Sequence, residues 1–204
     1  DCDRQGLLVA LLRGSFEYQG QKCSAASRAY IPSSVWDSIG EDLCSEVGKI
    51  KMGDARDFSN FMTAVIDQRA FDKISGYIDR ARGDDSCEVV AGGGFDDSNG
   101  WFIEPTIIVT SNPVSETMCE EIFGPVLTIY VYEDDDFEGA LGMCDTGSPY
   151  ALTGSIFANN EEDIQRAFEA LRFAAGNFYI NDKPTGAVVA QQPFGGARAS
   201  GTND

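Results

Sequence analysis

Two kinds of apolar pattern alternate along this chain, and their alternation limits the folds that it can adopt. Apolar residues recur at helical spacing in several segments, which predict helices at residues 5–16, 33–47, 70–81, 136–144 and 159–174. Short runs rich in β-branched and aromatic residues predict strands at residues 29–32, 89–91, 102–109, 126–132, 152–157 and 177–180. Because helices separate most of these strands, we expect an α/β fold with a mainly parallel, open sheet and flanking helices.

The composition is typical of a globular protein and excludes several classes of partner. The chain has 204 residues, of which 43% are hydrophobic, and this length suits one large domain or two small ones. No stretch approaches the roughly 20 consecutive apolar residues of a membrane-spanning helix, so we expect no membrane span. The net charge of −18 repels the phosphates of nucleic acids and the surface of acidic membranes, so we expect neither as a partner.

The chain contains no histidine, and this absence excludes several kinds of site. The chain alone cannot supply a Cys–His or Ser–His nucleophilic pair. Its six cysteines include no C-x-x-C pair, so neither a zinc site nor a disulfide framework is predicted. The acidic runs at residues 133–136 and 161–163 lack the spacing of a calcium loop, and we expect them to be solvated. We therefore expect no metal site.

One cysteine lies in a context that favours reactivity. Cys23 follows Gly20-Gln21-Lys22 and precedes a run of small residues. If Cys23 begins a helical turn, unpaired backbone N–H groups and the charge of Lys22 both favour the thiolate, which is the nucleophilic form. The alternative is a small buried side chain, which most free cysteines are. Five other cysteines compete for such a role, namely Cys2, Cys44, Cys87, Cys119 and Cys144.

Two further segments are unusual as plain structure. Residues 120–127 place two glutamates and Phe123 directly before a Gly-Pro bend into the predicted strand 126–132. Ligands of open α/β sheets gather at such loops beside strand ends, where a carboxylate can accept hydrogen bonds from ribose hydroxyls. The alternative is a helix end with a hydrophobic staple. Residues 181–201 form a long loop with four glycines and two prolines, and such loops are usually functional or disordered.

Three motifs in these segments together resemble the signatures of one known family. Gly20-Gln21-Lys22-Cys23, Glu121-Ile122-Phe123-Gly124-Pro125 and Pro193-Phe194-Gly195-Gly196 are similar to signatures of the aldehyde dehydrogenase superfamily, in the same order and spacing. The resemblance extends along essentially the whole chain. Residues 177–183 and 191–204 resemble the monofunctional 1-pyrroline-5-carboxylate dehydrogenase branch of that superfamily. The resemblance implies the α/β fold of the family's catalytic domain.

The resemblance also implies an activity and a set of site residues. Enzymes of this branch oxidise L-glutamate γ-semialdehyde to L-glutamate with NAD, the second step of proline catabolism. By motif position, Cys23 is expected to be the nucleophile that forms a thiohemiacetal and then a thioester. Glu121 and Phe123 are expected to bind NAD, the first at the nicotinamide ribose and the second near the nicotinamide. The positions that match substrate-binding residues of the branch are Ser24, Gly186, Ala187 and Phe194.

Some parts of the family cannot be placed in this chain. The family's dinucleotide-binding domain, its glutamate general base and its oxyanion-hole asparagine all precede the cysteine, and only 22 residues precede Cys23. We therefore expect residues 1–204 to be a catalytic domain from a longer chain, without the NAD-binding domain and inactive alone. We expect the parent enzyme to be a homo-oligomer, located in the bacterial cytoplasm, which we prefer, or in the mitochondrial matrix of a eukaryote.

Two alternatives stay open at the level of the sequence. Another semialdehyde dehydrogenase, such as one for succinate semialdehyde, would differ in the loop around Gly186 and Ala187. A non-catalytic fragment that keeps only the fold would have no reason to contain a reactive Cys23.

Overall fold

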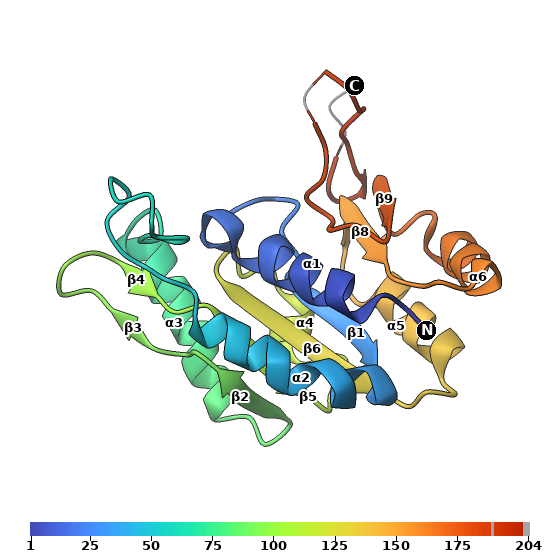
Figure 1. Ribbon diagram of the computed structural model, residues 1–204, viewed down its shortest axis with the longest axis horizontal. Coiled ribbons are helices and arrows are strands. Elements are labelled where there is room, and N and C mark those ends of the chain that lie inside the picture. The colour runs from blue at the N-terminus through green and yellow to red at the C-terminus, as the bar shows by residue number, and fades with distance from the viewer. Residues whose placement is uncertain (189, 202–204) are drawn as a thin grey trace.

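A four-stranded sheet forms the centre of the molecule, as a computed structural model shows (Figure 1). The structure describes residues 1–188 and 190–201, so Val189 of the predicted loop and residues 202–204 of the C-terminal segment lie outside the described residues. The strands follow the order β1 (Arg28–Pro32), β6 (Val126–Tyr132), β5 (Thr106–Thr110) and β2 (Cys87–Ala91). The pairs β1–β6 and β6–β5 are parallel and β2 is antiparallel to β5, which confirms a mainly parallel sheet.

Helices cover both faces of this sheet. The helices α1 (Arg4–Phe16) and α2 (Ser33–Gly48) pack on one face, and α3 (Gln68–Arg82) packs on the other (Figure 1). Neighbouring residues of β5 point to opposite faces, so Ile107 belongs to the core under α1 and α2 and Ile108 to the core under α3. Two apolar cores therefore fix the sheet between its helices.

Polar side chains mark where the helices begin. The Asp3 carboxylate accepts hydrogen bonds from the N–H groups of Gln5 and Gly6 at 3.1 and 3.2 Å and caps α1. Asp67 caps α3. Asn160 caps α6 (Glu161–Leu171), whose first turn contains the acidic run 161–163. The carboxylates of Asp3, Asp67 and the acidic run lie where the partial positive charge of a helix N-terminus stabilises them.

Most of the remaining elements lie beyond one of the two edge strands, β1 or β2 (Figure 1). A second, two-stranded parallel sheet pairs β8 (Thr153–Ile156) with β9 (Asn177–Ile180), and α5 (Phe137–Thr146) and α6 accompany it (Figure 1). The segment after β9 projects away from the body. The short elements are η1 (Glu17–Gly20), β3 (Phe95–Asp96), β4 (Phe102–Ile103), α4 (Glu116–Cys119), β7 (Tyr150–Ala151) and β10 (Ala197–Arg198).

The structure refines the sequence-based elements at a few points. The predicted strand 102–109 is interrupted at Pro105, since β4 ends at Ile103 and β5 begins at Thr106. The helix predicted up to residue 174 ends at Leu171. The described strands form one four-stranded sheet and three two-stranded sheets, and β8 pairs only with β9 among the described residues.

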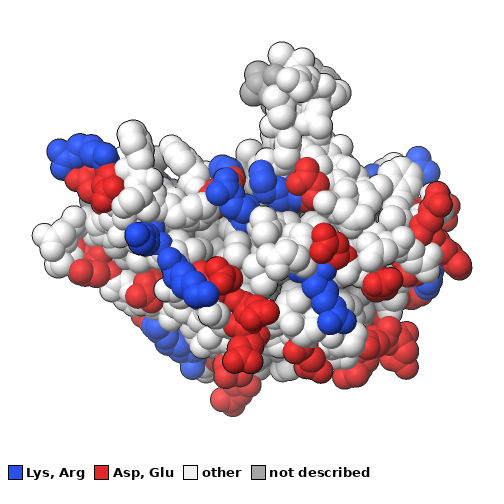
Figure 2. All heavy atoms as spheres, in the orientation of Figure 1, with Lys and Arg blue, Asp and Glu red and all other residues white. Residues whose placement is uncertain are grey.

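The surface reflects the acidic composition. In Figure 2, acidic side chains spread along the edge formed by α2, α5 and α6, while basic side chains gather between the end of α1 and the projecting segment. Within the part of the chain that the structure describes, no helix has both the length and the apolarity to cross a membrane.

Candidate active site

Cys23 lies in a tight turn after α1, where its side chain is exposed. The chain leaves α1 through the 3-10 helix η1, in which three successive residues have positive φ angles of 55°, 58° and 63°. A turn closes directly afterwards, with the N–H of Ala25 donating to the carbonyl of Lys22 at 3.0 Å. Cys23 is exposed, whereas the other five cysteines are partly buried. The Cys23 thiol is thus open to small molecules.

The structure modifies two local reasons for expecting a reactive Cys23. Cys23 lies in a single hydrogen-bonded turn and does not begin one of the helices. The Nζ of Lys22 donates to Oε2 of Glu17 at 2.9 Å, so a carboxylate holds this charge and it is not left free beside the thiol. Exposure on a fixed turn is the feature of Cys23 that the structure supports.

The cysteine turn packs directly against the 120–125 loop. Gly20 has a φ of 63°, and a Cβ at this position would lie 2.2 Å from the carbonyl oxygen of Gly124. Only glycine tolerates both that conformation and so close an approach. The side chain of Gln19 fixes the same turn, since it donates to the carbonyl of Ala64 at 3.3 Å and accepts from the N–H of Thr63 at 3.2 Å. Two segments far apart in the sequence therefore meet at backbone level.

Glu121 and Phe123 lie on the exposed side of the 120–125 loop. The carbonyl of Glu121 accepts a hydrogen bond from Nζ of Lys73 in α3 at 2.5 Å. The Glu121 side chain is exposed but sits in a recess: partial desolvation raises the pKa of its carboxyl, while the charges of Lys73 and Arg28 oppose that rise. Phe123 has a φ of 61° and is 40% exposed between two buried residues. The loop thus presents a carboxylate and an aromatic ring at the surface.

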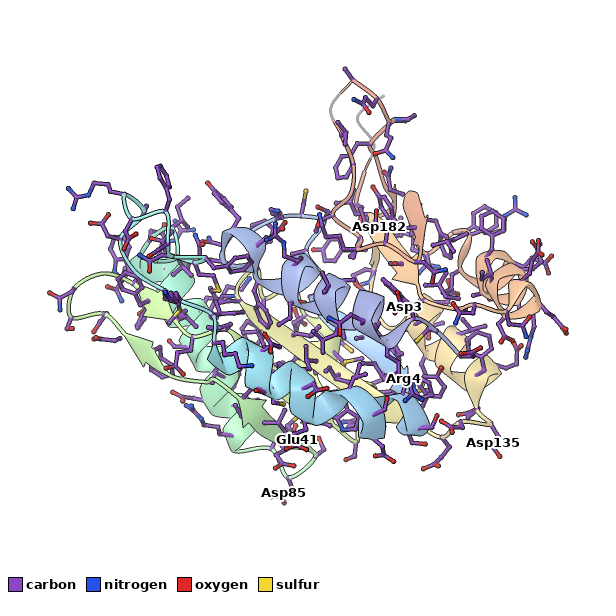
Figure 3. The ribbon with its side chains drawn as sticks, viewed as in Figure 1. Asp3, Arg4, Glu41, Asp85, Asp135 and Asp182 are labelled. Atoms are coloured by element: carbon purple, nitrogen blue, oxygen red, sulfur yellow. The ribbon has the colours of Figure 1, made fainter. Side chains whose placement is uncertain are left out.

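The segment after β9 approaches the cysteine turn from the C-terminal side. Pro184 Cδ and Lys183 Cβ lie 3.5 and 3.6 Å from the place where a Cβ of Gly14, in the last turn of α1, would be. The N–H of Ala26, just past the cysteine, donates to the carbonyl of Gly14 at 3.0 Å. In Figure 3, Asp182 marks the start of this segment beside α1. Both segments are therefore attached to the same residue of α1.

The remaining predicted substrate residues are held by their neighbours. The carbonyl of Ser24 accepts a hydrogen bond from Oγ1 of Thr153 at 3.5 Å. The residues on both sides of Phe194 bond through their backbones to the side chain of Asn177, at 2.9 and 3.3 Å. Gly186, Ala187 and Phe194 are partly buried. Among the described residues, no group of three or more acidic or cysteine side chains is arranged to hold a metal ion.

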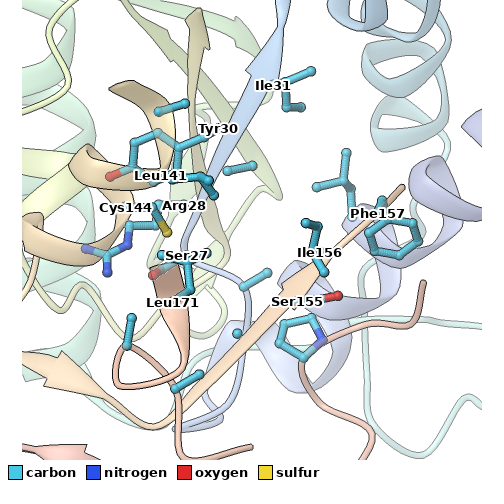
Figure 4. Close-up of a pocket in the computed structure, with 18 of the residues that line it drawn as sticks. Ser27, Arg28, Tyr30, Ile31, Leu141, Cys144, Ser155, Ile156, Phe157 and Leu171 are labelled. Carbon is cyan, nitrogen blue, oxygen red and sulfur yellow. The ribbon is translucent and has the colours of Figure 1, made fainter. Parts of the chain in front are cut away.

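A cavity of about 710 Å³ opens between β1 and β8, beside the cysteine turn (Figure 4). Cys23 and Glu121 line it. Five predicted site residues do not, namely Ser24, Phe123, Gly186, Ala187 and Phe194. Figure 4 shows Tyr30 and Ile31 of β1 on one wall and Ser155 and Ile156 of β8 on another. Neither strand has a partner on this side among the described residues, so the cavity is a gap between strand edges, and Cys23 and Glu121 lie at its border.

Sequence reasoning missed the charged side chains that hold these segments. Glu17 forms ion pairs with three basic side chains. Arg28 donates through Nη1 to the carbonyl of Met118 at 3.2 Å and so ties β1 to α4. The sequence does contain one indication of the ion pairs of Glu17. Glu17 follows Arg13 by four residues, which is the spacing of an ion pair within a helix. The contact of Lys73 with the 120–125 loop joins distant segments, and no local pattern indicates it.

Comparison with known proteins decides the family. The sequence profile described as "Aldehyde dehydrogenase family" matches residues 1–204. The chain belongs to the aldehyde dehydrogenase family. A protein of Dictyostelium discoideum named "Delta-1-pyrroline-5-carboxylate dehydrogenase, mitochondrial" is 60% identical over 202 residues, which are 99% of this chain and 36% of that protein. A human protein of the same name is 50% identical over 204 residues, which are 100% of this chain and 36% of that protein.

Solved structures of aldehyde dehydrogenases confirm the fold. The crystal structure of the Delta-pyrroline-5-carboxylate dehydrogenase from Mycobacterium tuberculosis bound with NAD matches with a TM-score of 0.91 at 50% sequence identity. The match covers 99% of this chain and 36% of the bacterial chain. The chain thus spans little more than a third of the relatives that it matches.

Proposed function

We propose that the parent protein of this chain oxidises L-glutamate γ-semialdehyde to L-glutamate with NAD, and that Cys23 is the nucleophile. The position of Cys23 carries the proposal: an exposed thiol lies in a turn that packs, at Gly20, against the loop presenting Glu121 and Phe123. The names of the relatives support the substrate, because 1-pyrroline-5-carboxylate is the cyclic form of this semialdehyde.

Cys23 stays covalently bound to the substrate carbon between the attack on the aldehyde and the release of the acid. Its thiolate sulfur attacks the aldehyde carbon and forms a C–S bond, and the backbone N–H of Cys23 donates to the resulting oxyanion. NAD, when bound, supplies the acceptor for the hydride that leaves the same carbon. Cys23 then holds a thioester. Addition of water and cleavage of the C–S bond release the carboxylic acid and regenerate the thiolate, with the family's upstream glutamate as the base.

Glu121 and Phe123 are the residues that would hold the nicotinamide end of NAD. Ribose hydroxyls can donate to the Glu121 carboxylate, whose recess reduces competition from water. The exposed ring of Phe123 offers a flat surface to the nicotinamide. The bond from Lys73 to the Glu121 carbonyl fixes the backbone that presents both groups. Contacts to the adenine and the phosphates come, in this proposal, from outside residues 1–204.

The α-carboxylate of the semialdehyde is assigned to Ser24, Gly186 and Ala187. The hydroxyl of Ser24 and the backbone N–H groups of the two loop residues can together bind a carboxylate without a buried arginine. Phe194 packs on the aliphatic part of the substrate. The attachment of Lys183 and Pro184 to Gly14 supports this arrangement, because it brings the start of the loop to the end of α1.

The location and assembly of the parent are part of the same proposal. The Dictyostelium and human relatives are named as mitochondrial, so we place a eukaryotic parent in the mitochondrial matrix. A bacterial parent belongs in the cytoplasm. The homo-oligomeric state rests on family resemblance.

A comparison of two aldehydes in the full-length parent tests the substrate assignment. Ser24→Ala removes one hydrogen bond to a charged group, worth roughly 1.5–3 kcal/mol. We expect kcat/KM for L-glutamate γ-semialdehyde to fall about 10- to 150-fold. A short aliphatic aldehyde without a carboxylate should be oxidised as before. Ser38→Ala is the matched control, because the Ser38 hydroxyl donates within α2, to the carbonyl of Val35 at 2.7 Å.

The other outcomes separate the alternatives. Equal losses for both aldehydes would show that Ser24 shapes only the cysteine turn. A wild-type parent that prefers succinate semialdehyde would establish the rival dehydrogenase. A parent that oxidises no aldehyde would leave a protein that keeps the family's fold without its activity.

A further inference from the structure

Three basic side chains converge on one mostly buried carboxylate at the base of the candidate site. The side chain of Glu17 is only 16% exposed. Its oxygens lie 2.5 Å from Nε of Arg13, 2.9 Å from Nζ of Lys22 and 3.9 Å from Nζ of Lys183. Among the ion pairs of the described residues, no other carboxylate has three basic partners.

The partners of Glu17 belong to the two segments that flank the proposed substrate. Lys22 directly precedes Cys23 in the cysteine turn. Lys183 opens the loop that continues to Gly186 and Ala187. Glu17 itself lies at the junction of α1 and η1. One carboxylate therefore connects the nucleophile's turn to the loop assigned to the substrate's carboxylate.

Glu17 is ionised in this network. Burial alone would raise the pKa of its carboxyl, but the hydrogen bond and charge of Lys22, with the charges of Lys183 and Arg13, outweigh burial and hold it below its usual value. A buried charge with this many partners is costly to leave unpaired. Removing the charge of Glu17 therefore releases the lysines on both sides.

Backbone contacts to α1 and β8 also place the two segments. Both are attached to Gly14, through the N–H of Ala26 and through packing of Lys183 and Pro184. In β8, the hydroxyl of Thr153 donates to the Ser24 carbonyl at 3.5 Å, and the hydroxyl of Ser155 donates to the Asp182 carbonyl. Among the side-chain contacts, the ion pairs of Glu17 join the two segments to each other. The loop beyond Pro184 is irregular. In such a loop, an ion pair at the first residues has a large influence on where the following N–H groups lie.

We propose that Glu17 is a positioning residue that holds the start of the 182–187 loop beside the Cys23 turn, and so sets how the carboxylate of an aldehyde is placed relative to the thiol. This inference rests on the proposed function. Glu17 acts through Lys22 and Lys183, and it binds no part of the substrate. Its effect therefore concerns the choice between aldehydes that carry a carboxylate and aldehydes that do not.

Glu17→Gln in the full-length parent tests the inference. A displacement of the loop by about 1 Å can cost up to about 100-fold in rate, so we expect kcat/KM for L-glutamate γ-semialdehyde to fall roughly 10- to 100-fold. The value for propanal, which has no carboxylate, should change about threefold or less, and the KM for NAD should stay the same. Glu46→Gln is the matched control, since it breaks an exposed ion pair with Lys49 in α2.

A second variant separates positioning from general damage. Lys183→Met removes one partner, whose side chain is 28% exposed, and should lower the same ratio of kcat/KM between the two aldehydes. In the Glu17→Gln background, Lys183→Met should then have little further effect, because the two residues act as one unit. Losses that add independently, or an unchanged ratio in both variants, would overturn the inference.

The outcomes also distinguish this inference from the proposed function. A wild-type parent that does not oxidise L-glutamate γ-semialdehyde would refute the function. An active wild type whose ratio survives both substitutions would refute the role of Glu17 alone. If Glu17→Gln fails to fold, the ratio measured for Lys183→Met decides the question.

Discussion

Burial separates Cys23 from several other cysteines of the chain. Desolvation by burial raises the pKa of Cys2, Cys44 and Cys144, which keeps these thiols protonated at neutral pH. Cys23 is exposed on a turn that Gly20 and Gln19 hold in place. An exposed thiol reacts with small molecules that a buried thiol never meets. Accessibility therefore favours Cys23 as the proposed nucleophile.

Substitution of Cys23 tests its chemical role. Without the thiolate no C–S bond forms, and hydride must leave an aldehyde hydrate that the enzyme does not hold. In the full-length parent, we expect Cys23→Ala to lower kcat at least about 10³-fold, a loss of roughly 4 kcal/mol in transition-state stabilisation. The affinity for NAD should stay nearly unchanged. Cys44→Ala, which alters a thiol packed against the core, is the control. More than a tenth of wild-type activity in Cys23→Ala would show that this residue is structural.

The depressed pKa of Glu17 makes a prediction about acid stability. A carboxyl whose folded pKa is lowered stabilises the fold above its unfolded pKa, which is about 4.3, and loses that contribution as pH falls through the folded pKa. We expect the parent's urea midpoint to exceed that of Glu17→Gln by a constant amount from neutral pH to about pH 5, and the difference to shrink below about pH 4. A difference that does not depend on pH would contradict an ionised Glu17.

At the scale of elements, the site depends on one close contact between the cysteine turn and the 120–125 loop. Gly20 approaches the carbonyl of Gly124, and Gly124 in turn packs on Ile74 of α3, where a Cβ would lie 2.5 Å from its Cδ1. Because both residues lack a Cβ, the cysteine turn, the 120–125 loop and α3 can pack in direct contact. The relative position of Cys23 and Glu121 is therefore fixed by glycines that have no chemical role.

Gly20→Ala should separate the turn from the loop. The new Cβ meets the Gly124 carbonyl, and the left-handed conformation costs alanine about 1–2 kcal/mol by itself. We expect a lower thermal midpoint and an equal loss of kcat/KM for aldehydes with and without a carboxylate, because the nucleophile itself moves. Gly48→Ala is the matched control, since a Cβ there would meet no described atom within 4 Å other than those of its chain neighbours and its own helix backbone. A Gly20→Ala enzyme with normal activity would show that the contact is dispensable.

Local patterns predicted the elements well, and contacts between distant segments less well. The strands at residues 126–132 and 177–180 agree with β6 and β9 at both ends, because β-branched and aromatic runs carry a local signal. At Cys23 the chain forms a single hydrogen-bonded turn, since η1 ends at Gly20 and no helix begins there. The pairing of Lys22 with Glu17 is set by the path of η1, which no spacing in the sequence reveals.

At the scale of the molecule, the sequence predicted the α/β arrangement but not which strand edges pair. Helices alternating with strands indicated a parallel α/β arrangement, and β1, β5 and β6 confirm it. Strand patterns do not state which edges pair, so the gap between β1 and β8 could not be foreseen. The candidate site lies at one end of this gap, because Cys23 and Glu121 line it. The site was found through motif resemblance, which combines segments that local physics treats separately.

The last prediction concerns the 204-residue chain by itself, which spans 36% of the human relative. It contains Glu121 and Phe123, which would contact only the nicotinamide end of NAD, and two contacts cannot offset the entropy lost when a dinucleotide is bound. We expect no steady formation of NADH from L-glutamate γ-semialdehyde, measured by absorbance at millimolar NAD. A thiol reagent should still modify Cys23 faster than the other five cysteines, which would show that the turn has formed. Steady NADH production by this chain would contradict the assignment of the remaining cofactor contacts to other parts of the parent protein.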